Sequence, residues 1–315
     1  VAKSTTCGHD LFWVREVLRC IERGEVVGGV LDSSVEIAKH AAKSAADNVL
    51  SHLDPAKHAK LLALLKPWWR DIPAGSFNMG SNEHPGDKLI HRVSFTSGFQ
   101  MLGVPVTWAM YRLFDPGHDA ARDDFRGKLP LNAQDEVPVY NVNWFASVMF
   151  AEWVGARLPL EPEWEYACRA GTRTRYWSGN GDDDLARVGW HGDYAGSGNA
   201  HGHPHPVALK PENAWGLYDV HGNVFEWCLD AWDAEAYAAY ADGLTVDPRG
   251  LTFAVDGGPM TSARNASLGV SRNMRGGAWC DPPELALSAY RCGLAPLTSD
   301  SFTGFRLLRC SADPP

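Results

Sequence analysis

The sequence predicts an α+β fold in which short strands and short helices are joined by long irregular segments. Three observations favour this class. Beyond about residue 70, apolar residues fall in short runs that glycine and proline interrupt. Two segments among those runs carry the start and stop signals of helices. Thirteen tryptophans in 315 residues supply large rings for burial, which suits a fold with little regular structure.

The first seventy residues predict a small helical extension. Apolar residues recur at helical spacing over 11–21, and further helices are expected over 32–53 and 54–65. The third has an aspartate as its N-cap and a proline at its first helical position, and the next proline should end it. We therefore expect a helical N-terminal extension over 1–70 and a main domain over 71–315.

The main domain should begin with strands. Residues 72–80 predict a strand and a turn, and residues 93–96 alternate as a half-buried strand does. A helix is expected over 143–154, because Asn143 is a suitable N-cap before an apolar run.

A second helix is expected over 161–170, with Pro162 in its first turn and Gly171 just past its end. Its acids at 161, 163 and 165 could suggest acid–base catalysis, but acids in a first turn complement the helix dipole, which suffices to explain them. The glycine- and histidine-rich segment 179–210 predicts a loop, and the three aspartates at 182–184 should be solvated in it.

Charge and cysteine usage narrow the class of partner. The net charge of −9, with no run of lysine and arginine, argues against nucleic acid. No stretch of 18 apolar residues exists, so no membrane partner is expected. Seven scattered cysteines without a CxxC pair or a signal peptide favour buried or free thiols and a cytoplasmic location.

Several segments together resemble one family, the sulfatase-modifying-factor or formylglycine-generating enzyme family, in order and in spacing over nearly all of residues 72–310. The segments are 72–81 (IPAGSFNMGS), 138–144 (PVYNVNW), 156–167 (ARLPLEPEWEYA), 205–207 (HPV), 216–228 (GLYDVHGNVFEWC), 275–279 (RGGAW) and 304–306 (GFR). The resemblance implies a C-type-lectin-like fold of the formylglycine-generating-enzyme type. It does not fix the function, because one fold hosts many functions.

The copper oxidases of this family need two cysteine thiolates, because Cu(I) prefers sulfur ligands. The resemblance places Asp281 and Ala286 at those two positions, and Cys280 lies one residue early. No copper is therefore expected. The related iron-dependent sulfoxide synthases use a His-x-x-x-His-x-Glu helix. The extension has His40, His52 and His58 without that spacing, so no iron is expected either.

Two other metal sites remain open. The histidines of the 179–210 loop could bind zinc, copper or iron, but a loop without metal is the favoured alternative; they are His191, His201, His203 and His205. The resemblance also implies a structural calcium. Its oxygen ligands would come from Asp219, Gly222, Val224 and Glu226. Otherwise the two carboxylates would only hydrogen-bond the local turn.

The segment 280–302 is the most informative part of the chain. Typical members of the family carry mostly Asp, Asn and Arg here. The variable proteins of diversity-generating retroelements, which share the fold, place their diversified residues in this stretch. Their diversification rewrites adenines in AAC-type codons and cannot produce Trp, Met, Gln, Glu or Lys, and only Glu284 belongs to that set. An ordinary paralogue encoded by a GC-rich gene would carry a similar bias.

Leu294, Leu297 and Phe302 lie among glycine, proline and polar residues and are poor core candidates, so some should be exposed. The function expected is therefore non-catalytic binding, and the expected ligand is a protein. The predicted ligand contacts are Cys280, Asp281, Pro282, Leu285, Cys292, Gly293, Leu294, Leu297, Thr298, Asp300, Ser301 and Phe302. One alternative is a metal-dependent oxidoreductase that uses the histidine loop or Cys280 with Cys292. Another is a scaffold subunit that recruits a partner through the helical extension.

Overall fold

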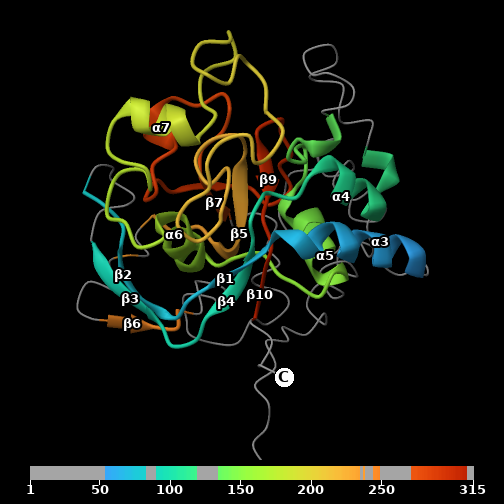
Figure 1. Ribbon diagram of the computed structural model, residues 1–315, viewed down its shortest axis with the longest axis horizontal. Coiled ribbons are helices and arrows are strands. Elements are labelled where there is room, and N and C mark those ends of the chain that lie inside the picture. The colour runs from blue at the N-terminus through green and yellow to red at the C-terminus, as the bar shows by residue number, and fades with distance from the viewer. Residues whose placement is uncertain are drawn as a thin grey trace, which may run out of the picture.

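The computed structural model describes residues 54–82, 90–118, 134–234, 237, 244–248 and 271–310 (Figure 1). The helices expected over 11–21 and 32–53 lie outside the described residues. No described helix has the length and apolar character needed to cross a bilayer.

Three small sheets carry the strands. The first has the order β1-β4-β10 and is antiparallel throughout, and the second has the order β2-β3-β6. The third has the order β8-β7-β5-β9, in which β9 lies parallel to β5. The strands are β1 (Trp69–Ile72), β2 (Gly75–Met79), β3 (His91–Phe95), β4 (Phe99–Leu102), β5 (Phe225–Ala231), β6 (Leu244–Val246), β7 (Arg272–Arg275), β8 (Cys292–Leu294), β9 (Thr303–Phe305) and β10 (Leu308–Cys310).

The helices lie around these sheets. In Figure 1, α3, α4 and α5 gather on one side of the third sheet, and α7 lies on the other side. The α-helices are α3 (Pro55–Leu65), α4 (Trp108–Phe114), α5 (Trp144–Trp153), α6 (Glu161–Arg169) and α7 (Asp182–Val188). Short 3-10 turns cover Lys66–Trp68, Gln134–Glu136 and Pro283–Leu285.

The predicted capping residues act as caps. The Asn143 side chain accepts the backbone N–H of Ala146 at 2.9 Å at the start of α5, and the Asp54 side chain caps α3 in the same way. At the end of α6, Ala170 and Gly171 take positive φ values of 44° and 89°. Glycine tolerates this left-handed conformation, which is why it marks the end of a helix.

The prediction of an irregular loop over 179–210 is wrong for residues 182–188, which form α7. Asp184 accepts the backbone N–H groups of Asn180 and Gly181, so its carboxylate caps the helix that it belongs to. The three aspartates in the first turn also complement the helix dipole. They are helix-start signals and not residues of an irregular loop.

The described end of the predicted extension packs into the domain. Leu61 and Leu65 of α3 are fully buried, and they belong to the main hydrophobic core together with residues of α4 and α5. That core also contains Trp227 and Trp279, which come from the third sheet and the turn after it. Residues 54–65 are therefore part of the folded unit.

Candidate ligand-binding surface

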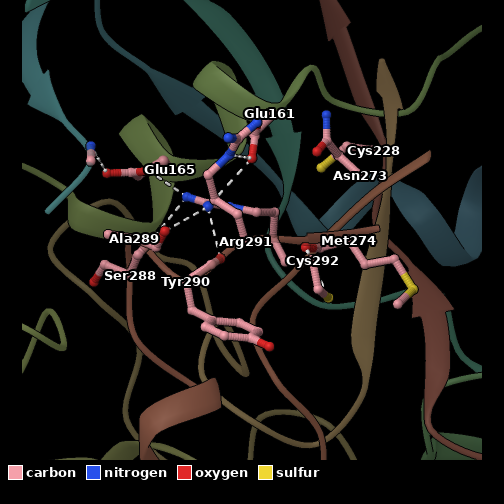
Figure 2. Close-up of polar contacts among 12 residues, drawn as sticks. Glu161, Glu165, Cys228, Asn273, Met274, Ser288, Ala289, Tyr290, Arg291 and Cys292 are labelled. Carbon is pink, nitrogen blue, oxygen red and sulfur yellow. Dashed lines mark hydrogen bonds and ion pairs between the residues drawn. The ribbon is translucent and has the colours of Figure 1, made fainter. Parts of the chain in front are cut away.

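A buried guanidinium anchors the middle of segment 280–302. Arg275 of β7 donates to the backbone carbonyls of Ala289 at 3.0 Å, Tyr290 at 2.7 Å and Ser288 at 2.8 Å. The same side chain forms an ion pair with Glu165 of α6. Figure 2 shows the α6 acids on one side of this cluster and residues 288–290 on the other. The segment is thereby attached to α6 through main-chain atoms.

The acids of α6 do more than complement the helix dipole. Glu161, Glu163 and Glu165 are all buried. Burial of a charged carboxylate is costly unless the group is paired. Glu163 pairs with Arg157 at 2.6 Å, and Glu161 pairs with Arg291 at 2.6 Å. The sequence-based explanation was therefore incomplete, because Glu161 and Glu165 also join α6 to arginines more than 100 positions away, while Glu163 pairs locally.

The pKa of Glu165 depends both on its burial and on the neighbouring guanidinium groups. Its burial alone would raise the pKa of the carboxyl group, but the guanidinium groups of Arg169 and Arg275 lower it below the ordinary value. The acid is therefore ionised and held as the centre of an ion-pair network. Nothing in this arrangement leaves it free to exchange protons with a substrate.

The C-terminal loop 295–302 is also held by its main chain. The backbone N–H of Asn141 donates to the Asp300 carbonyl at 2.7 Å, and the indole N–H of Trp279 donates to the Ser301 carbonyl at 2.9 Å. The backbone N–H of Phe225 donates to the carbonyl of Phe302 at 2.8 Å. These bonds fix the path of the loop without using its side chains.

The predicted contact residues lie at the surface, in contrast to residues 286–289 of the same segment. Pro282 is exposed and the other eleven are half-buried, whereas residues 286–289 are buried. Leu294, Leu297 and Phe302 pack their inner edges against the main core and keep part of their surface outside. Each of these three side chains is therefore partly exposed and partly packed on the core.

Gly293 differs from the rest of the predicted set. A Cβ atom at this position would lie 2.2 Å from Cγ of Trp232, far inside van der Waals contact. The Trp232 ring in turn carries the Arg291 guanidinium at 4.8 Å from its centre. Gly293 is therefore suited to close packing and cannot present a side chain to a ligand.

The two cysteine thiols of the predicted surface are weakly acidic. Burial raises the pKa of both Cys280 and Cys292 to about 12, so both thiols are protonated at neutral pH. Ala286, at one of the family's two cysteine positions, has no exposed surface.

The cysteines outside this surface differ in state. Cys168 and Cys228 are free and buried. Cys310 is disulfide-bonded, whereas the sequence predicted buried or free thiols.

The histidine loop is packed on an indole ring. His205 stacks on Trp190 with 3.8 Å between ring centres, and its Nε2 bonds the Ala200 carbonyl at 2.9 Å. Lys210 lies 4.0 Å from the centre of the same indole. Across the described parts of the chain, no three His, Cys, Asp or Glu side chains gather as a metal site would require. These contacts do not favour a metal in the loop.

The two carboxylates of the predicted calcium site have protein partners. Glu226 accepts from the Arg306 guanidinium at 2.8 Å and from the Trp164 indole at 2.7 Å. Asp219 accepts the Ala208 backbone N–H at 2.8 Å. A cation at Glu226 would have to compete with a guanidinium for this carboxylate. A structural calcium held by Asp219, Gly222, Val224 and Glu226 stays a prediction.

One surface residue was missed from the sequence. Tyr194, in the loop after α7, has 61% of its surface exposed, and its ring contacts Trp279 edge-on with 4.9 Å between ring centres. Trp279 immediately precedes Cys280, so Tyr194 lies beside the start of segment 280–302. The available signal was an aromatic residue inside a polar glycine-rich loop, where no core could take it.

The sheets and the framework around segment 280–302 define a C-type-lectin-like α+β domain of the formylglycine-generating-enzyme type. The family model for the sulfatase-modifying factor enzyme 1-like domain matches residues 70–311, and the chain belongs to this family.

Sequence relatives carry the name formylglycine-generating enzyme. The protein of that name from Thermomonospora curvata is 36% identical over 198 residues, which are 56% of this chain and 56% of the relative. The one from Mycobacterium tuberculosis is 28% identical over 303 residues, covering 78% of this chain and 97% of the relative. The chain thus spans little more than half the length of the Thermomonospora relative.

Solved structures share the fold at lower identity. Treponema denticola variable protein 1 superimposes with a TM-score of 0.62 at 22% identity, covering 77% of this chain and 95% of that protein. PvdO from Pseudomonas aeruginosa superimposes with a TM-score of 0.57 at 23% identity, covering 77% and 94%.

Proposed function

We propose that this protein is a non-catalytic ligand-binding protein. Its variable C-terminal surface, residues 280–302, would be displayed on a C-type-lectin-like scaffold, as in the variable proteins of diversity-generating retroelements. The observation that carries the proposal is the contrast in exposure within one segment. The predicted contact residues are half-buried or exposed, while residues 286–289 between them are buried.

The physical basis is preorganisation. A binding loop that is already ordered loses little conformational entropy when the ligand arrives. Here the order comes from Arg275 beneath the segment and from Trp279 and Asn141 around its C-terminal loop. Leu294, Leu297 and Phe302 would supply apolar anchor surface, and polar neighbours such as Thr298 would tune the choice of partner. A protein is the partner that suits such a mixed surface.

The alternative is a metal-dependent oxidoreductase related to the enzymes whose names the sequence relatives carry. Such an enzyme would need thiolates or imidazoles free to bind a redox metal. Among the described residues no three His, Cys, Asp or Glu side chains gather around Cys280 and Cys292, and the imidazole Nε2 of His205 is bonded to a backbone carbonyl. The residues of this chain therefore support binding more than oxidation.

The experiment is a library in which the side chains at 294, 297, 298, 301 and 302 are randomised and selected against a panel of unrelated proteins. Selected variants should bind new targets while their melting temperatures stay within a few degrees of the parent. A matched library at the buried positions 286, 287 and 289 should yield few folded members. If the surface library loses folding as often as the buried one, the proposal fails.

Genomic context tests the variable character separately. A reverse transcriptase gene beside this gene, with a near-copy of its 3′ end, would support diversification. A fixed sequence of segment 280–302 in many isolates would contradict it and leave only an invariant binding surface.

A further inference from the structure

The strand β8 gives the proposed binding surface an open sheet edge. It is the first strand in the order β8-β7-β5-β9, and it pairs antiparallel with β7 on one side only. In such a pair the N–H and C=O groups of alternate residues point away from the neighbouring strand. Within the described residues, no hydrogen bond outside the ladder with β7 uses the main chain of residues 292–294. All three residues are half-buried, so the strand reaches the surface.

The opposite edge of the same sheet, at β9, is covered. The backbone N–H of Val106 donates to the Phe305 carbonyl at 2.9 Å, and a Cβ atom at Gly304 would lie 2.5 Å from the Val139 carbonyl oxygen. Proteins usually cover, shorten or charge a strand edge, because an open edge pairs with other chains. β8 is short, but it carries neither a charged side chain nor a proline. It is therefore the edge of this sheet that can accept a further strand.

Apolar side chains flank this edge on both faces of the sheet, because successive residues of a strand point to opposite faces. On the face of Gly293, the half-buried Trp232 ring lies directly on the strand, where a Cβ atom would come within 2.2 Å of its Cγ. On the other face, Cys292 and Leu294 pack part of their surface against the main core. A strand added to β8 would therefore meet an indole ring on one face and an aliphatic side chain on the other.

We propose that the partner presents an extended polypeptide segment that pairs with the open edge of β8, main chain to main chain. Its alternate side chains would contact Trp232 and Leu294. The unpaired N–H and C=O groups of a strand edge are complementary to those of another extended chain, which is why a polypeptide is the expected occupant. This inference rests on the proposed function and names the way in which the surface recognises its partner.

Main-chain pairing suits a surface whose side chains vary. Hydrogen bonds to the edge of a strand contribute to affinity whatever side chains the two chains carry, and the neighbouring side chains supply specificity. Three residues of β8 form only a few such bonds, so the side chains of the following loop, including Leu297 and Phe302, would contribute the rest. Substitutions in the segment would then change the choice of partner without removing the main-chain contribution.

The test begins with random peptides displayed on phage and selected on the immobilised full chain. Selected peptides are then synthesised with a single N-methyl group at each position in turn, which removes one N–H and keeps the side chain. Affinity should fall about tenfold or more at every second position of the paired stretch and change little at the positions between, because only alternate N–H groups face β8. A peptide bound as a helix or through its side chains alone would show no such alternation.

Amide hydrogen exchange of the unmodified full chain gives a second measurement. The bound peptide should slow exchange in β8 by about tenfold or more, because outward-pointing amides become hydrogen-bonded. The matched control is β6, the last strand of a different sheet, whose exchange should not change. If the free chain instead forms a dimer that protects β8 without peptide, the occupant of the edge is a second copy and this inference fails.

Two variants separate this inference from the proposed function. Leu297→Ser and Phe302→Ser should change which peptides are selected, while the alternation on N-methylation persists. Peptides that lose affinity for either variant but show no alternation and no protection of β8 would overturn this inference and leave the proposed function standing. Peptides that tolerate both variants and every N-methyl group, or a selection that yields no binder, would count against both.

Discussion

Arg291 and Glu161 lie 130 positions apart and form a two-pronged ion pair, with Nε to Oε1 at 2.6 Å and Nη2 to Oε2 at 2.7 Å. Arg291 immediately precedes β8, and Glu161 is the first residue of α6. The pair therefore joins the proposed binding segment to the scaffold at a buried point.

Glu161→Gln should lower the free energy of unfolding by about 3–5 kcal/mol, because it leaves the Arg291 guanidinium buried without its counter-charge. Urea unfolding measures the change. Glu284→Gln, at an exposed position of the same segment, should change stability by less than about 0.5 kcal/mol. Equal effects of the two substitutions would mean that the ion pair does not hold the segment.

Gly293→Ala should destabilise the domain by about 1–3 kcal/mol, because the new methyl group would collide with the Trp232 ring. Thr298→Ala, a change of similar size in the same half-buried segment, should be nearly neutral. The two melting curves are compared under one condition. A stable Gly293→Ala protein would show that Trp232 moves aside, and Gly293 would rejoin the variable positions.

His221 should stay neutral at pH 5. Its Nδ1–H donates to the Ala286 carbonyl at 2.8 Å, and its Nε2 accepts the Trp177 N–H at 3.1 Å. Burial lowers its pKa from 6.5 to about 4, so protonation would place two donors face to face. Nitrogen NMR of the imidazole should report the neutral form at pH 5 in the folded chain and the charged form in urea.

The sign of the stability effect follows from that shift. Above pH 6.5 both folded and unfolded chains hold His221 neutral, and its contribution is complete. As pH falls from 6.5 to about 4, the unfolded chain binds a proton that the folded chain does not, so stability decreases by about 3 kcal/mol. A charged His221 in the folded protein at pH 5 would contradict this.

Cys280 should react slowly with iodoacetamide at pH 7, and its rate should rise steeply with pH. Burial raises its pKa to about 12, and the thiolate is the reactive form. Mass spectrometry of the labelled peptide follows the rate, with a free cysteine in a short peptide as the control. Rapid labelling at neutral pH, together with copper bound in a one-to-one ratio, would favour the oxidoreductase alternative.

Local signals in the sequence predicted much of the scaffold. Asn143 as a cap, Asp54 before a proline, and Gly171 after α6 each act within a few residues, and each marks the boundary it predicted. Family resemblance supplied the rest of the fold class. The aspartates at 182–184 were misassigned because a cluster of acids reads equally well as a solvated loop or as a first helical turn.

The candidate surface was less predictable, because its character depends on contacts between distant segments. The sequence around Gly293 does not show that the Trp232 ring packs on it, and the sequence around Tyr194 does not show that its ring lies against Trp279. From the sequence, the helix dipole alone explained the acids of α6. The structure shows that these acids are buried, and a buried carboxylate needs a counter-charge. Periodicity and spacing report on neighbours in sequence, and these relationships are made only when the chain is folded.

The scaffold holds segment 280–302 chiefly through carbonyl oxygens, including those of Ser288, Pro296 and Asp300. Every amino acid carries this acceptor, and proline, which has no N–H to donate, carries it too. Apart from Arg291, whose side chain pairs with Glu161, a gene could therefore rewrite most side chains along this path without removing these main-chain bonds. The capacity of the surface to change its side chains would then depend on the backbone bonds and not on the side chains that it carries now.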